Sequence, residues 1–138
     1  MTLGWKEEAK AFFGEFCKEL PASVTVEPLS DKLEMYTLQP TNPSAAPMHI
    51  AVSRDEVIIS AGYGTRFELG PLEASQSEVQ ELLHSVINGH LIEHVGPRSV
   101  KYELRTSDGR TFTGRSSRGL NSSPGDSGEL RYAPYSNS

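Results

Sequence analysis

The stretch VIISAGYGTRFELG, residues Val57–Gly70, decides the fold because it is compatible with two different structures. Two glycines, Gly62 and Gly64, follow an apolar run, as in the loops that bind dinucleotide phosphates through backbone N–H groups. Those loops carry a third glycine and lead directly into a helix. Here Phe67 stands at the third glycine position, and the residues around it alternate between polar and apolar, which is typical of a strand. The stretch therefore predicts a strand, a turn and a second strand.

Helical periodicity lies on both sides of this unit. Apolar residues recur at helical spacing over residues 5–20, and Pro21 ends that helix because the residue before a proline avoids the α region. A second helix is predicted to begin near Ser75, since Ser75 and Glu78 have the spacing of a capping box. An Asn-Gly pair at 88–89 predicts its end.

Short alternating segments predict the strands. Three of them, at 24–27, 31–39 and 48–52, precede the quoted unit. After the second helix, Asp108-Gly109 lies between two alternating segments and predicts a hairpin. We therefore expect an α+β fold in the order helix, about five strands, helix, two or three strands. The strands form an antiparallel meander sheet, and both helices pack on one of its faces.

The domain organisation follows from length and composition. A chain of 138 residues is typical of one domain, which we place at residues 1–115. Residues 116–138 are rich in Ser, Gly and Pro, and this composition predicts a flexible tail. Whether that tail docks on the domain is left open by the sequence.

Charge and composition exclude several classes of function. The net charge is −5; residues 1–96 carry 6 Lys+Arg and 14 Asp+Glu, a net −8, whereas residues 97–138 carry 7 and 4, a net +3. An acidic body argues against nucleic-acid binding, which needs clustered basic residues. No apolar run approaches the ~18 residues of a membrane span. The single cysteine, Cys17, excludes an intramolecular disulfide, and we expect a cytoplasmic protein.

A histidine pair raises the question of a metal site. His90 and His94 fit the pattern H-x-x-E-H, in which two histidines one helical turn apart bind zinc and the glutamate acts as base. Gly89 directly before the pattern breaks the helix that this chemistry needs. In a strand the two histidines would lie roughly 13 Å apart, too far to share a metal directly. We therefore predict no metal and no cofactor.

Exposed side chains on turns and strands supply candidate contacts for a partner. A tyrosine and an arginine follow the glycine turn, and these two residue types are frequent anchors of protein interfaces. Basic residues alternate with apolar ones on the predicted hairpin, so they point outward. The candidate partner-binding residues are Tyr63, Arg66, Glu68, Lys101, Arg105 and Arg115.

No constellation in the sequence supports an enzyme: there are no paired carboxylates at a defined spacing, no nucleophile with a base and no cofactor loop. The pattern of two helices on a meander, with an acidic body, resembles the small bacterial immunity proteins that neutralise a partner toxin. It also resembles the acidic secretion chaperones of the type III class, which begin with a helix and three strands.

Both resemblances imply a non-catalytic domain that binds another protein, and the first implies that it masks a basic partner surface. The remaining alternative is a small-ligand or metal-binding domain that uses His90 and His94 or the Gly62–Gly64 loop. The oligomeric state is not determined by the sequence.

Overall fold

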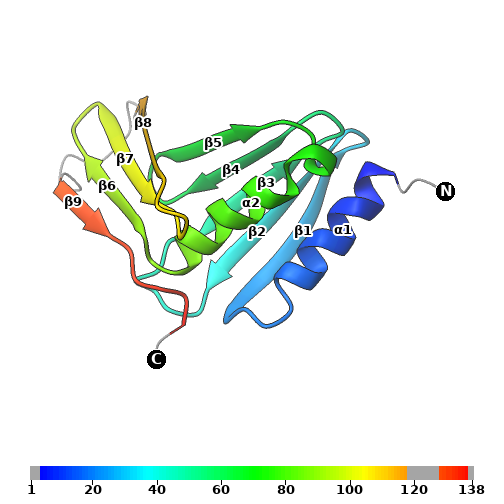
Figure 1. Ribbon diagram of the computed structural model, residues 1–138, viewed down its shortest axis with the longest axis horizontal. Coiled ribbons are helices and arrows are strands. Elements are labelled where there is room, and N and C mark those ends of the chain that lie inside the picture. Colours follow the sequence, from blue (N-terminus) through cyan, green and yellow to red (C-terminus); the bar gives the residue numbers. More distant parts are fainter. Residues whose placement is uncertain (1–3, 118–127, 137–138) are drawn as a thin grey trace.

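The computed structural model describes residues 4–117 and 128–136 and consists of two helices and two antiparallel sheets (Figure 1). The helices are α1 (Trp5–Phe16) and α2 (Leu72–Ile87). The first sheet has five strands in sequence order: β1 (Ala22–Ser30), β2 (Leu33–Pro40), β3 (Met48–Val52), β4 (Val57–Ala61) and β5 (Thr65–Leu69). The second has four in the order β8-β7-β6-β9: β6 (Leu91–Val95), β7 (Ser99–Arg105), β8 (Thr111–Ser117) and β9 (Gly128–Arg131).

This arrangement confirms the predicted α+β class and the order of elements. Both helices lie on the same face of the first sheet, and the second sheet stands beside it, next to the end of α2 (Figure 1). Residues 65–69 form a strand that pairs with β4, so the quoted stretch is a strand, a turn and a strand as predicted.

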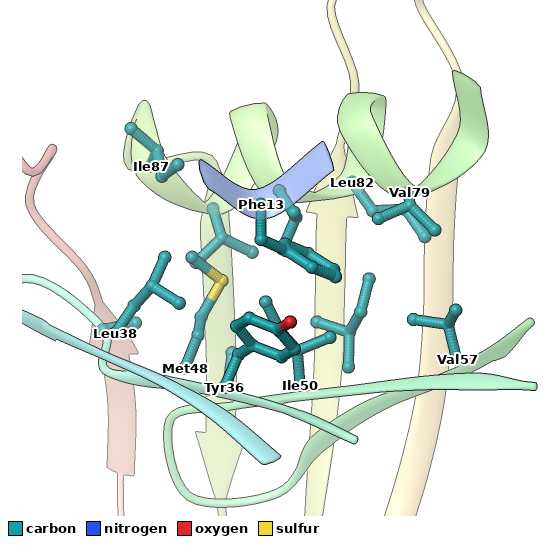
Figure 2. Packing of buried hydrophobic residues seen from close by; sticks show 14 of the residues in the cluster. Phe13, Tyr36, Leu38, Met48, Ile50, Val57, Val79, Leu82 and Ile87 are labelled. Atoms are coloured by element: carbon teal, nitrogen blue, oxygen red, sulfur yellow. The ribbon is translucent and has the colours of Figure 1, made fainter. Parts of the chain in front are cut away.

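The core lies between the first sheet and the helices (Figure 2). Tyr36, Ile50 and Ile59 stand opposite one another on β2, β3 and β4, and all three are buried. From α1, the ring of Phe13 lies 4.6 Å from that of Tyr36, centroid to centroid. Burying an apolar side chain of this size contributes roughly 1.5–3 kcal/mol. The larger contribution comes from a buried stripe on α2: Val79, Leu82, Leu83, Val86 and Ile87.

The start of α2 differs from the prediction. The helix begins at Leu72, directly after Pro71, and Ser75 lies inside it with no side-chain cap at its N-terminus. Pro71 is the N-cap residue, with an extended backbone (ψ 143°), and its missing N–H costs the helix no hydrogen bond. The buried side chain of Leu72 then favours one additional turn before the predicted capping box.

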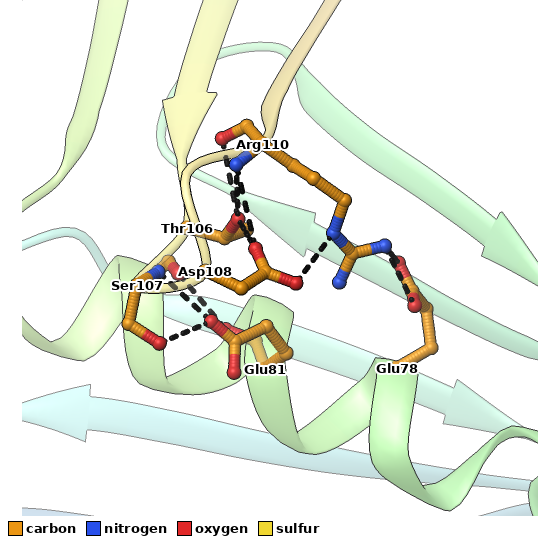
Figure 3. A network of polar contacts seen from close by, with 7 residues as sticks. Glu78, Glu81, Thr106, Ser107, Asp108 and Arg110 are labelled. Carbon is orange, nitrogen blue, oxygen red and sulfur yellow. Dashed lines mark hydrogen bonds and ion pairs between the residues drawn. The ribbon is translucent and has the colours of Figure 1, made fainter.

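Glu78 joins the polar contacts that tie the β7–β8 turn to α2 (Figure 3). Arg110 donates from Nη1 to both carboxylate oxygens of Glu78 at 3.2 Å, and from Nε to Asp108 at 2.7 Å. Ser107 donates to Glu81 from its backbone N–H at 2.9 Å and from its hydroxyl at 2.6 Å, and these two bonds lower the pKa of Glu81. The predicted hairpin is therefore present, and its turn anchors the second sheet to the helix.

The C-terminal segment is packed where the structure describes it. Ser116 and Ser117 belong to β8, and residues 118–127 lie outside the described ranges. Residues 128–131 form β9, which pairs with β6 and gives the second sheet a fourth strand rather than the two or three expected. Tyr135 is buried and donates its hydroxyl to the carbonyl of Ala46 at 2.6 Å. This aromatic anchor holds residues 128–136 against the domain.

Candidate functional site

The glycine turn between β4 and β5 binds an internal carboxylate. Glu93, on β6, is fully buried, and its two oxygens accept the backbone N–H groups of Tyr63 at 2.9 Å and Gly64 at 2.8 Å. It also accepts the hydroxyl of Thr65 at 2.8 Å and the hydroxyl of Tyr132. The N–H groups that would hold a phosphate in a nucleotide loop are therefore occupied by a residue of the chain itself.

Both glycines are required because the turn lies close against the second sheet. Gly62 has a φ of +61°, in the left-handed region that other residues avoid, and a Cβ there would collide with the Glu93 carboxylate. A Cβ on Gly64 would lie 2.8 Å from the Cβ of Val100 on β7. Burial, reinforced by the bond to Glu93, raises the pKa of Tyr132, so this phenol remains a donor. The turn thus fastens the first sheet to the second.

In the H-x-x-E-H pattern, the glutamate and the second histidine lie on opposite faces of β6. Because side chains alternate along a strand, Glu93 on β6 points to the buried face while His94 points outward. The Nδ1 atom of His94 lies 3.9 Å from a carboxylate oxygen of Glu129. Within residues 4–117 and 128–136, no group of three His, Cys, Asp or Glu side chains could hold a metal ion.

The residues predicted to contact a partner lie on two different sheets. Tyr63 is 57% exposed at the turn, and Arg66 and Glu68 on β5 form an ion pair at 3.0 Å. On the second sheet, Lys101 of β7 stands directly opposite Arg115 of β8.

Arg105, also on β7, pairs with Glu103 at 3.2 Å. The structure thus brings together Arg66 with Glu68 and Lys101 with Arg115. Tyr102 of β7 donates its hydroxyl to the backbone carbonyl of Arg66 at 2.8 Å, but among the described residues no ion pair or side-chain hydrogen bond joins the side chains of the two groups.

A different feature is an apolar groove between α1 and β1. Its volume is about 650 Å³. Val24 and Val26 of β1 stand opposite Leu38 and Tyr36, so they point to the helix side of the sheet, where the core lies. Yet they are 37% and 50% exposed, because α1 does not cover them. The side of the groove toward the core is made by Phe13, Cys17 and Tyr36.

The rim of the groove is charged. Three lysines of the first helical segment line it, Lys6, Lys10 and Lys18, together with Glu7 and, on β2, Glu34. One carboxylate oxygen of Glu34 is buried and has no hydrogen-bond partner among the described residues. A buried acceptor without a donor is costly, so a bound molecule that donates there would be favoured.

Burial keeps two polar side chains of the groove, Cys17 and Tyr36, in their protonated forms. Burial raises the pKa of the Cys17 thiol, which disfavours the reactive thiolate. Burial and the charge of the neighbouring Glu34 raise the pKa of Tyr36 to about 12, so this phenol stays protonated at neutral pH. Cys17 and Tyr36 therefore contribute neutral contact surface to the groove.

The groove residues were not among the predicted contacts. The alternation of Val24 and Val26 in the sequence predicts a strand face, which is normally covered. The signal that could have identified them is Pro28 in the same strand, since proline is typical of edge strands. An edge position makes incomplete covering of the inner face more frequent than in a central strand.

Comparison with protein families, curated proteins and solved structures found no match to this chain. Among the helices in the described ranges, none is long and apolar enough to cross a membrane.

Proposed function

We propose that this chain is a non-catalytic domain that binds another protein through the groove between α1 and β1. The observation that carries the proposal is the exposure of Val24 and Val26 on the face of the sheet that points to the core. Apolar side chains that line a concave surface beside an edge strand are a common docking site for partner segments. The raised pKa of Cys17 supports a role in binding rather than in catalysis.

The specific form that we propose is an inhibitor of the immunity type in the cytoplasm, with a secretion chaperone as the second form. The acidic excess of residues 1–96, 14 Asp+Glu against 6 Lys+Arg, would steer a partner with a basic surface toward the domain, whereas the lysines on the rim of the groove act only on the segment that enters it. The small-ligand alternative is less well supported, because the amides of the Gly62–Gly64 loop already bind Glu93.

Changing Val26 to glutamate should weaken partner binding without unfolding the domain. Val26 is half exposed, so the added charge can remain in solvent, but it would place a carboxylate in the apolar part of the groove. The matched control is Thr25→Glu, which adds the same charge to the neighbouring position on the other face of β1. A partner identified from the source cell should be purified and titrated against all three proteins.

We expect Val26→Glu to weaken the complex at least about 10-fold, equivalent to ~1.4 kcal/mol, while Thr25→Glu binds like the wild type. Thermal unfolding should show that both variants are folded. Equal affinity of all three proteins for that partner would refute the groove as the binding site.

A further inference from the structure

We infer that the groove takes an extended, acidic segment of the partner, which adds to β1 as a further strand of the first sheet. This inference rests on the proposed function of protein binding and specifies the chemistry of the bound segment. In the described residues β1 pairs only with β2, so the backbone groups of its other edge are open. An extended peptide satisfies such an edge through main-chain hydrogen bonds.

The sequence of β1 limits where the added strand can lie. Pro28 has no N–H group, and the register with β2 shifts between Pro28 and Ser30. Regular pairing is therefore confined to residues 22–27. A segment of roughly six residues spans this length, and its alternate side chains would lie beside Val24 and Val26 in the groove.

The helix wall of the groove determines the charge of the segment. Lys6, Lys10 and Gly14 are spaced four residues apart and follow one side of α1, Lys18 lies just beyond the end of that helix, and all four line the groove. None of the three lysines has an ion-pair partner among the described residues. The amine of Lys6 lies 5.5 Å from the centroid of the Trp5 ring, and the three lysines outnumber the two carboxylates of the groove, Glu7 and Glu34. This excess of amines beside an apolar hollow favours a segment that combines carboxylates with apolar side chains.

Gly14 has no side chain, so the groove is open at this position between Lys10 and Lys18. A Cβ placed on it would meet nothing within 4 Å, so a larger residue fits the fold and would project into the groove. Glycine is also unfavourable inside a helix, by about 1 kcal/mol relative to alanine. Gly14→Leu should therefore keep or raise stability while it blocks the groove, which separates loss of binding from loss of folding.

The test uses a random library of linear 12-residue peptides displayed on phage and selected against the full chain. We expect the selected peptides to carry apolar residues two positions apart, together with Asp or Glu. A synthetic copy of one selected peptide should bind at least about 10-fold more weakly to Gly14→Leu and to a Lys6→Glu, Lys10→Glu double variant. Arg98→Glu, a charge reversal at an exposed turn of the second sheet, should bind unchanged. Added salt should weaken the binding.

Several results would overturn the inference. These are enrichment of basic peptides, enrichment of peptides with helical spacing, binding that Gly14→Leu leaves intact, and no enrichment at all. A dimer of the chain that Val26→Glu converts to monomer would assign the edge to a second copy. A partner that is sensitive to Val26→Glu but indifferent to the lysine reversals would overturn the acidic segment and leave the proposed function standing.

Discussion

Replacing Glu93 by alanine should lower the free energy of unfolding by about 3–5 kcal/mol. Its carboxylate is fully buried and accepts two backbone N–H groups and two hydroxyls from other elements. Alanine removes every acceptor and leaves those donors unpaired in a cavity. Glu93→Gln should fall between alanine and the wild type, because an amide keeps one acceptor oxygen but presents an N–H₂ group to donors.

Urea denaturation of the variants measures this effect. The control is Glu103→Ala on the neighbouring strand, whose side chain points to the solvent face and pairs with Arg105. We expect that control to cost less than about 1 kcal/mol, as is usual for surface ion pairs. If Glu93→Ala were no more destabilising than Glu103→Ala, the carboxylate would not be the fastening between the two sheets.

The second large effect concerns Gly62. Gly62→Ala should cost about 2–4 kcal/mol, because the alanine must adopt a positive φ and its Cβ would displace the Glu93 carboxylate. Gly109 provides the control: its φ is +88°, and a Cβ there meets nothing within 4 Å. Gly109→Ala should therefore show the backbone strain alone, roughly 1–2 kcal/mol.

The difference between the two glycine variants isolates the collision with Glu93. It should shrink in a Glu93→Ala background, since the smaller side chain leaves room for the methyl group, and a double-mutant cycle reports this coupling. Equal losses for Gly62→Ala and Gly109→Ala would mean that the turn tolerates a side chain and that its glycines serve only backbone conformation.

Local pattern was enough to predict most of the architecture. Phe67 in place of a third glycine, and the alternation around it, correctly separated a strand pair from a nucleotide loop. The Asp108-Gly109 hairpin was also correct, because turn chemistry acts between neighbouring residues. The capping box was wrong because the buried Leu72 extends α2 beyond the Ser75 signal.

Features that depend on distant contacts could not be predicted in the same way. Glu93 lies 30 residues along the chain from Tyr63, in the turn that it binds. From the sequence alone, Glu93 is recognisable only as part of the H-x-x-E-H pattern. Tyr135 docks against Ala46 from a segment whose composition predicts a flexible tail. The exposure of Val24 and Val26 depends on the position of α1 on the sheet. The hydrophobic periodicity of the sequence does not give that position. The roles of Tyr63, Lys101 and the other predicted contacts remain predictions.

Amide hydrogen exchange of the domain, free and in complex with its partner, tests the central claim most directly. The groove account predicts that binding slows exchange in residues 22–27 of β1, whose outer edge is otherwise open, and in the part of α1 that faces it. Exchange over residues 99–117 of the second sheet should not change. Protection confined to that second sheet, with β1 exchanging as fast in the complex as in the free domain, would contradict the account.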